Sequence, residues 1–419
     1  MSLRRRTFVL GGATTPFIGK KHPDFVWKGH PDFGKRENPT IDELLREAVQ
    51  GALVTTGTPA PSVQKGWVGN FVGELFAKQG HLGAALVGAE PALRNKPAMR
   101  VEGACASGGL AFASAVESIQ AGTDIALVAG VEVQTTESAR TGGDYLARAA
   151  HYPRQRAIDD FTFPALFARR AKAYREAYGT TEEDIGRVSV KAYDNAHRNP
   201  LAHMRAVPMD LATASTASDK NPNFLSNAEL SPYIKMSDCS QVSDGASAMI
   251  VVSEAGLKAL GKTPADAVEV VSLAHATGNL WEDGDPLKLE TSAYAVGKVY
   301  SDAGIRPEDV DVAEVHDCFT VTELLMMEAC GWAKPGQAAA MVREGRTAIE
   351  GDRPINTGGG LVGFGHPVGA TGVKQIVELW RQMKGKSGDY QVKGQPDTAL
   401  AVNMGGDDKT VVATVLRSA

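Results

Sequence analysis

Cysteine is scarce in this sequence, and long hydrophobic runs are missing from it. The 419 residues include only four cysteines, Cys105, Cys239, Cys318 and Cys330. None of them forms a C-x-x-C pair, and their spacing fits neither a zinc site nor a disulfide framework. We therefore expect a reducing, intracellular compartment. No apolar stretch is long enough to cross a bilayer, so we expect a soluble protein without a membrane span.

An excess of charge of one sign is also missing. The chain carries 44 basic and 49 acidic residues, a net charge of −5, which indicates no nucleic-acid partner. An apolar run that predicts a buried strand follows the basic start, Met1 to Arg6, so we expect no cleaved presequence. The C-terminal residues 417–419 do not form the Ser-Lys-Leu peroxisomal signal, and cytoplasm and mitochondrion both stay open.

Glycine, by contrast, is abundant, with 45 residues, which suits the tight turns of a large α/β enzyme. The chain is too long for one simple core and predicts two domain-sized units. Short runs of Val, Ile, Leu and Ala alternate with helical patterns, which favours an α/β fold with covered sheets. The predicted strands cover 8–10, 125–133, 248–252, 268–274, 310–315, 399–402 and 411–416, and the predicted helices 41–55, 109–122, 164–178, 182–198, 292–304 and 321–330.

A weak internal repeat divides the chain into two halves. Residues 40–70 run as a helix, a turn with proline and a strand, and residues 292–317 repeat that order. Later in each half, a glycine-rich turn bears a reactive residue, Cys105 in the first and His366 in the second, and two similar halves would bring these turns together. The polar stretch at about 135–236 predicts a subdomain inserted over the active site, and an oligomer-contacting excursion is compatible with the same pattern.

Cys105 lies between glycines and alanines at the start of a helical pattern. The positive end of a helix dipole would favour the thiolate, which is the nucleophilic form of cysteine. The small neighbours would let backbone amides approach whatever the sulfur attacks. On this segment alone, a small buried hydrophobic residue is an equally good interpretation.

Three further loops carry groups suited to catalysis. His366 lies in a glycine-rich turn at a helix start and is a candidate for the base that takes the thiol proton. His316 and Cys318 lie two apart at the end of a predicted strand and would share a face; for this loop alone, a buried cysteine beside a satisfied histidine is the favoured interpretation. After another strand, the backbone amides of residues 402–406 could form an anion hole.

Taken together, these loops resemble the catalytic loops of the thiolase family. The motifs are Cys-Ala-Ser at 105–107, His-Asp-Cys-Phe at 316–319, Gly-His-Pro at 365–367 and Asn-Met-Gly at 403–405, in the family's order and spacing. The cysteine at position 318 resembles the sterol-carrier-protein type of thiolase in particular.

The resemblance implies the thiolase fold, with two related βαβαβαββ halves in five layers (α-β-α-β-α) and an inserted loop domain. We expect an N-terminal half at 1–255, including the loop domain at about 135–236, and a C-terminal half at 256–419. The implied activity is an acyl-CoA:acetyl-CoA C-acyltransferase, which condenses acyl groups or cleaves 3-oxoacyl-CoA reversibly through an acyl-cysteine. Acetyl-CoA, 3-oxoacyl-CoA and coenzyme A are its implied substrates. The resemblance implies no metal and no permanently bound cofactor. It also implies a homodimer or a homotetramer.

The resemblance also gives the nucleophile and the acid/base groups their positions. Cys105 would be acylated, and His366 would activate it. Cys318 would take the acid/base role that ordinary thiolases give to a cysteine at the position of Asn403. His316 would lie near the thioester oxygen. Independently of the resemblance, forming a carbon–carbon bond next to a thioester needs an acyl carrier and a second group to move a proton.

Two further positions come from the same resemblance, and two features depart from it. The amides of Cys105 and Gly405 match an oxyanion hole, and Ser240 matches a serine that contacts the pantetheine arm. Asp407 and Asp408 stand where small residues are expected.

The segment at 212–233 also departs from the family pattern, because it looks long, so the substrate pocket is expected to be unusual.

One alternative function is another thiolase-fold enzyme, either a decarboxylating condensing enzyme or a carbon–carbon lyase. Lyases that resemble this family carry tyrosines at the positions of Cys105 and Cys318. The other alternative is a catalytically quiet protein that binds acyl-CoA or a partner protein.

Overall fold

The computed structural model describes residues 2–419, and the first residue of the predicted N-terminal half, Met1, lies outside the described residues. Within them, nine strands form one hydrogen-bonded sheet in the order β3-β2-β4-β5-β1-β6-β9-β8-β7. The strands are β1 (Ser2–Thr14), β2 (Lys65–Gly69), β3 (Ala98–Val101), β4 (Ile125–Glu132), β5 (Gly245–Ser253), β6 (Val268–Thr277), β7 (Val312–Val315), β8 (Thr398–Gly405) and β9 (Thr410–Ser418).

Local signals define several helix ends. Thr40 and Glu43 form a capping box at the start of the first helix, and Gly57 ends it in a left-handed conformation. The helices are α1 (Ile41–Thr56), α2 (Gly73–Phe76), α3 (Leu82–Ala89), α4 (Ser107–Gln120), α5 (Ala139–Leu146), α6 (Tyr152–Gln155), α7 (Thr162–Tyr178), α8 (Glu182–Arg198), α9 (Leu211–Ser215), α10 (Glu254–Ala259), α11 (Glu290–Ala303), α12 (Thr320–Ala329), α13 (Ala338–Arg343) and α14 (Val368–Met383).

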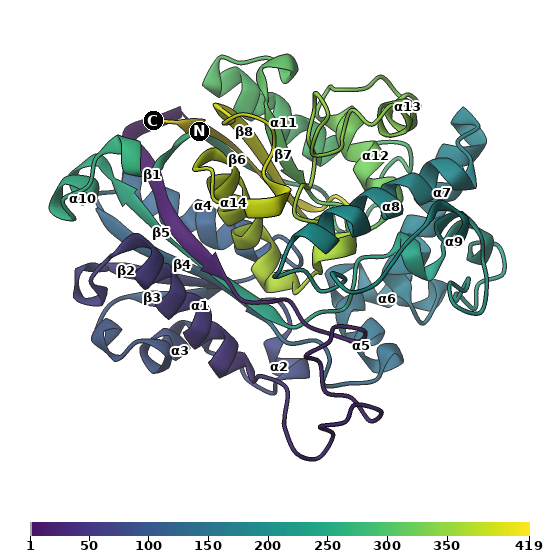
Figure 1. The fold of residues 1–419 in the computed structure, drawn as a ribbon, viewed down its shortest axis with the longest axis horizontal. Helices are drawn as coiled ribbons and strands as arrows, with labels where there is room; N and C mark the ends of the chain where they lie inside the picture. The colour runs from purple at the N-terminus through teal and green to yellow at the C-terminus, as the bar shows by residue number, and fades with distance from the viewer. Residues whose placement is uncertain (1) are drawn as a thin grey trace.

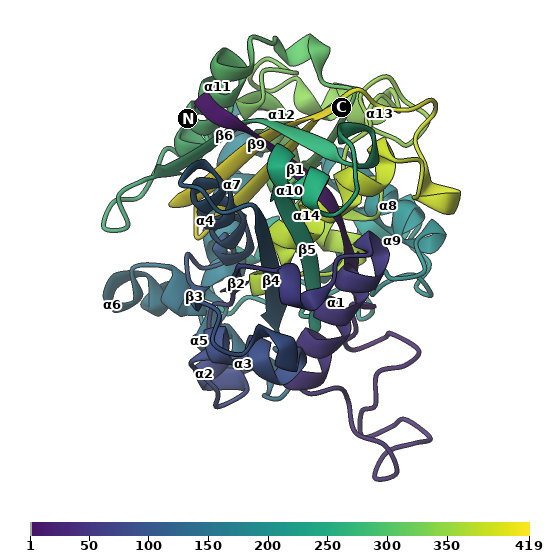
Figure 2. The ribbon, with the colours of Figure 1, turned by 90° about the vertical axis from the view of Figure 1, so that its left-hand side faces the viewer.

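Two helices form the centre of the molecule. Helices α4 and α14 pack on each other, and both contact strands from both halves of the sheet. Helices α1 and α3 cover β1 to β5 from outside, whereas α11 covers β6, β8 and β9. Figure 2 shows this layering from top to bottom, with α11 above, α4 and α14 in the middle, and α1 and α3 below. Strands β4 and β5 are buried at every residue, which explains their uninterrupted apolar sequences.

The strand order βαβαβαββ is complete in the first half and incomplete in the second. The pairing of β1 with β6 joins the two halves into one sheet. In the second half, the strand expected before α14 is reduced to one parallel bridge between Ala313 and Ile355. Pro354, directly before this bridge, has no N–H group to donate, and glycines at 358–360 weaken strand formation after it. The bridge therefore does not extend into a longer strand.

The chain between β4 and β5 forms the segment that the sequence predicts as an inserted subdomain, and it carries α5 to α9. Figure 1 shows α7 and α8 beside α12 on the right of the molecule, with α9 packed on α8. Phe167 of α7 stacks on Phe319, with ring centroids 4.5 Å apart. This stack fixes the inserted segment directly onto the His-Asp-Cys-Phe loop. Among the described residues, no helix is long and apolar enough to cross a membrane.

Candidate active site

The Cys105 loop joins β3 to α4 through a tight turn. Ala104 has a left-handed backbone, with φ of 53°, which is unusual for a residue with a side chain. The Glu102 carboxylate accepts the Ala104 N–H at 2.6 Å, and the Ser107 hydroxyl accepts the Gly103 N–H at 3.0 Å. These bonds hold the turn so that Cys105 lies just before the first residue of α4.

The His366 loop enters α14 in an equivalent way. The His366 N–H lies 3.2 Å from Gln241 O and 3.3 Å from Ser243 Oγ, which fixes the backbone. The ring Nδ1 lies 2.7 Å from the Thr371 hydroxyl, one turn into the helix. The other nitrogen, Nε2, is buried and has no hydrogen-bond partner. An unpartnered imidazole nitrogen is free to take a proton from a group in the site.

The two helices that carry these loops touch backbone to backbone. A side chain at Gly108 would come within 2.8 Å of Gly369 O, and one at Gly372 within 2.2 Å of Gly109 N. Glycines are therefore required where α4 crosses α14, because any Cβ atom would push the helices apart.

This crossing brings the predicted residues into one cluster. The sulfur of Cys105 and one ring nitrogen each of His316 and His366 lie within 4.8 Å of one another. The two imidazoles meet edge to face, with centroids 5.1 Å apart. Cys318 follows His316 by two residues, and the charge of Cys105 contributes, after burial, to raising the pKa of the Cys318 thiol, so the two sulfurs interact electrostatically.

Burial favours the neutral forms of Cys105, His316 and His366. Burial raises the pKa of Cys105 to about 12, although hydrogen bonds from the amides of Gly406 and of Cys105 itself lower it. Burial and then the charge of Lys374 lower the pKa of His366 to about 3, and burial also lowers the pKa of His316 well below its ordinary value. Burial therefore opposes the thiolate that the helix dipole is expected to favour, and the dipole effect stays a prediction.

The same three atoms of Cys105, His316 and His366 are close enough to surround a metal ion. Sulfur and imidazole ligands suit zinc, which binds the thiolate form of cysteine. Since the Cys105 thiol is protonated here, metal binding would have to displace a proton held by a pKa of about 12.

The last glycine-rich loop places backbone against Cys105. A Cβ atom at Gly405 would lie 2.1 Å from Gly103 O, so only glycine permits this approach. The amide that hydrogen-bonds the Cys105 sulfur belongs to Gly406, one residue beyond the predicted Gly405. Gly406 has a left-handed backbone, with φ of 66°. This turn orients the Gly406 amide toward the Cys105 sulfur.

The two acidic residues that depart from the expected pattern both have partners. The Asp407 carboxylate accepts the Nε–H of the buried Arg170 of α7 at 2.6 Å. Asp408 accepts the N–H groups of Thr291 and Ser292 at 2.8 and 3.0 Å, at the start of α11. These bonds hold the loop after Gly406 to the inserted segment on one side and to the second half on the other.

Ser240 lies on a segment that connects two of the loops. Its N–H donates to Cys318 O at 2.9 Å. The preceding residue, Cys239, forms an isolated antiparallel β-bridge with Phe319. The next residue, Gln241, receives the backbone N–H of His366. Ser240 is therefore next to the cluster, and its contact with a pantetheine arm stays a prediction.

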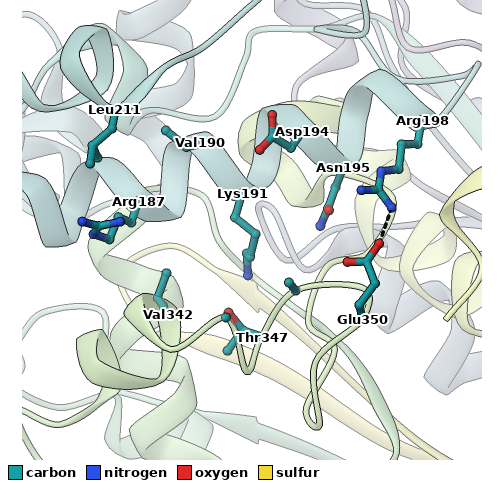
Figure 3. Close-up of a pocket in the computed structure, with 12 residues that line it drawn as sticks. Arg187, Val190, Lys191, Asp194, Asn195, Arg198, Leu211, Val342, Thr347 and Glu350 are labelled. Carbon is teal, nitrogen blue, oxygen red and sulfur yellow. Dashed lines mark hydrogen bonds and ion pairs between the residues drawn. The ribbon is translucent and has the colours of Figure 1, made fainter. Parts of the chain in front are cut away.

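A cavity of about 250 Å³ lies apart from this cluster, between α8 and residues 342–350 (Figure 3). Arg187, Lys191 and Arg198 of α8 face it from one side, and Thr347 and Glu350 from the other. Arg198 and Glu350 form an ion pair across one end at 2.6 Å. None of the cysteines or histidines of the cluster lines this cavity.

Comparison with known sequences agrees with the loops. Residues 30–255 match the family described as "Thiolase, N-terminal domain", and residues 272–418 match "Thiolase C-terminal domain-like". The chain belongs to the thiolase family. The resemblance seen in the sequence is confirmed by these matches.

Several individual thiolase-family proteins are similar along most of the chain. An "Acetyl-CoA acetyltransferase" of Methanothermobacter thermautotrophicus is 32% identical over 376 residues, covering 89% of this chain and 93% of its own. "Sterol carrier protein 2" of Rattus norvegicus is 30% identical over 423 residues, covering 97% of this chain and 71% of its own.

Solved structures confirm the thiolase fold. Human mitochondrial 3-ketoacyl-CoA thiolase in complex with CoA superimposes with a TM-score of 0.72 at 16% identity, covering 100% of this chain and 99% of its own. The "Ltp2-ChsH2(DUF35) aldolase" superimposes with a TM-score of 0.78 at 20% identity, with the same coverage. Identities this low show the fold alone.

Proposed function

We propose that this protein is an acyl-CoA:acetyl-CoA C-acyltransferase that acts reversibly through an acyl group on Cys105. The observation that carries the proposal is the convergence of Cys105, His366 and His316 within 4.8 Å, with Cys318 beside them. A similarly sized relative is named acetyl-CoA acetyltransferase, and a structural neighbour is described in complex with CoA. Both support coenzyme A thioesters as substrates and no permanently bound cofactor.

In the first half-reaction, the Cys105 sulfur attacks the thioester carbonyl and its proton passes to His366 Nε2. Because the resting thiol is neutral, proton transfer accompanies the attack rather than preceding it. The N–H groups of Cys105 and Gly405 are proposed to hold the oxyanion of the tetrahedral intermediate, with the Gly406 amide, which contributes to lowering the pKa of Cys105, next to them. Collapse of the intermediate leaves an acyl-cysteine, and the CoA thiolate takes the proton from His366.

In the second half-reaction, the Cys318 thiol is proposed to pass its proton to His366 Nε2, and the resulting thiolate takes a proton from the α-carbon of acetyl-CoA. The resulting enolate attacks the acyl carbonyl on Cys105, forms the carbon–carbon bond and releases the 3-oxoacyl thioester. The Cys105 sulfur regains a proton from His366 as it leaves. Cleavage of a 3-oxoacyl-CoA by CoA follows the same steps in reverse, with Cys318 as the acid that protonates the enolate carbon.

The two other functions have weaker support. A structural neighbour is an aldolase, but at 20% identity it shares only the fold. The cysteines at positions 105 and 318 favour acyl transfer over the carbon–carbon lyase, because both groups needed for a thiolase are present. The buried partners of Asp407 and Asp408 remove the main argument for a catalytically quiet protein, since both residues have structural roles.

We also propose that the halves at 1–255 and 256–419 each supply part of the site, and that the protein is a homodimer or homotetramer. Strand β3 forms one edge of the sheet, and its Met99 side chain is 49% exposed. A short edge strand with an exposed apolar side chain is suited to pairing with a second copy.

The test is incubation with acetyl-CoA followed by measurement of the intact protein mass. We expect one acetyl group on the wild-type protein and none on Cys105→Ala. Cys318→Ser should still acquire the acetyl group while losing turnover in the thiolysis of 3-oxoacyl-CoA esters of increasing length. An unmodified wild-type protein would instead support the binding protein, and acetylation of Cys105→Ala would refute the assigned nucleophile.

A further inference from the structure

The side-chain amide of Asn403 has only one orientation that fits its surroundings. Its Oδ1 accepts the Gly109 N–H at 3.0 Å, and its Nδ2 donates to Cys105 O at 3.1 Å. An inverted amide would place two donors against each other at Gly109 and two acceptors against each other at Cys105. The side chain is 3% exposed and wedged against Gly372, so it has no room for another rotamer.

The same NH₂ group determines which nitrogen of His316 carries the proton. Asn403 Nδ2 lies 3.3 Å from His316 Nδ1. Because an amide NH₂ group only donates, Nδ1 must present its lone pair. The imidazole is neutral, since burial lowers its pKa, and a neutral ring holds a single proton. That proton is therefore on Nε2, which makes Nε2 a hydrogen-bond donor.

His366 has the opposite arrangement. The hydroxyl of Thr371 donates its only proton to Pro367 O at 3.1 Å. It can then only accept from His366 Nδ1, which lies 2.7 Å away. The lone pair of His366 is left on Nε2, the nitrogen that has no hydrogen-bond partner. One ring of the pair is thus prepared to donate a hydrogen bond, and the other to accept a proton.

We propose that Asn403 is a positioning residue that fixes the Nε2–H form of His316 and so provides a donor for the thioester oxygen. This role rests on the proposed function, whereas the protonated nitrogen is a property of the free protein. If Asn403 did not set it, His316 could present a lone pair to a developing oxyanion. Loss of one such donor lowers the rate by about 10²–10³.

The direct test is ¹⁵N NMR of the full-length protein labelled on its nine histidines, with His316→Gln assigning the signal. We expect the proton of His316 on Nε2 in the wild type. Asn403→Asp has the same shape, but its carboxylate can only accept, so the proton of His316 should move to Nδ1. The rate of acetylation of Cys105 should then fall by about 10²–10³. That rate should recover at lower pH, where the protonated carboxyl group again offers a donor to Nδ1.

The matched control is Asn223→Asp in the inserted segment. Asn223 donates to Ser231 O and Ile234 O, and its replacement should leave the proton of His316 on Nε2. A wild-type proton on Nδ1 would overturn the proposal, even if Asn403→Asp does not fold. So would an Asn403→Asp protein with an unchanged tautomer or an unchanged acetylation rate. A wild-type protein that has the Nε2–H form but gains no acetyl group would contradict the proposed function and leave the tautomer assignment intact.

Discussion

Replacement of Arg170 by methionine should both destabilise the protein and slow its acylation. The Arg170 side chain is 1% exposed, and its Asp407 partner is 5% exposed. The Nη1 group of Arg170 also donates to the carbonyl oxygens of residues 285, 286 and 288. Removing Arg170 leaves the buried Asp407 carboxylate with only the more exposed Arg169 beside it, and the loss of one partner of a buried ion pair costs about 3–5 kcal/mol.

The catalytic consequence follows from the position of Asp407. It comes directly after Gly406, whose amide hydrogen-bonds the Cys105 sulfur. When the buried ion pair is lost, this amide is no longer held in place. We therefore expect the rate of Cys105 acetylation to fall toward the factor of about 10²–10³ that one lost oxyanion donor causes.

Arg169→Met is the matched control. Arg169 lies 3.4 Å from the same carboxylate of Asp407, but its side chain is 30% exposed. An exposed pair of this kind contributes about 0–1 kcal/mol. Urea unfolding at one fixed protein concentration compares the two variants, and rapid-quench mass measurement gives the acetylation rates. An Arg170→Met protein within about 1 kcal/mol of Arg169→Met, with a wild-type acetylation rate, would refute this reasoning.

Two further predictions follow from the protonation states and from the start of α11. Because the pKa of Cys105 is about 12, the thiolate fraction of the free protein rises with pH, and alkylation by iodoacetamide should accelerate about tenfold per unit from pH 6 to 9. His366, with a pKa of about 3, stays neutral there and adds no inflection, whereas a plateau would indicate a preformed thiolate–imidazolium pair. Asp408→Ala removes the acceptor of Thr291 N and Ser292 N and should lower the free energy of unfolding by about 1–2 kcal/mol, measured in urea. An unchanged free energy of unfolding would show that water replaces the Asp408 carboxylate as the acceptor of these two N–H groups.

Most of the long elements were predictable because each has a local cause. Helix α8 begins at a capping box of Thr181 and Asp184, and its residue range matches the prediction. Strand β3 was not predicted, since it is short and only partly buried, and it lies at the edge of the sheet. The strand before α14 in the second half is only one bridge long, next to Pro354, and the repeat in the sequence does not show this shortening.

The site shows the same division between local and distant causes. The positions of Cys105, His316, Cys318 and His366 followed from loop motifs and from the repeat, which together imply their convergence. The upward shift of the Cys105 pKa could not be predicted from the sequence, because the elements that bury Cys105 are distant from it along the chain. The hydrogen bond by which the Gly406 amide lowers the pKa of Cys105 could not be predicted either, because residue types alone do not determine the left-handed turn at Gly406.

The crossing of α4 and α14 has a consequence for how this enzyme can diversify. The spacing of nucleophile and base is set where one main chain touches another, so no side-chain exchange there can adjust it gradually. The inserted segment, by contrast, contacts the loop of Cys318 through side chains such as Phe167, which stacks on Phe319. New acyl preferences can therefore arise in that segment while the interval between sulfur and imidazole stays constant.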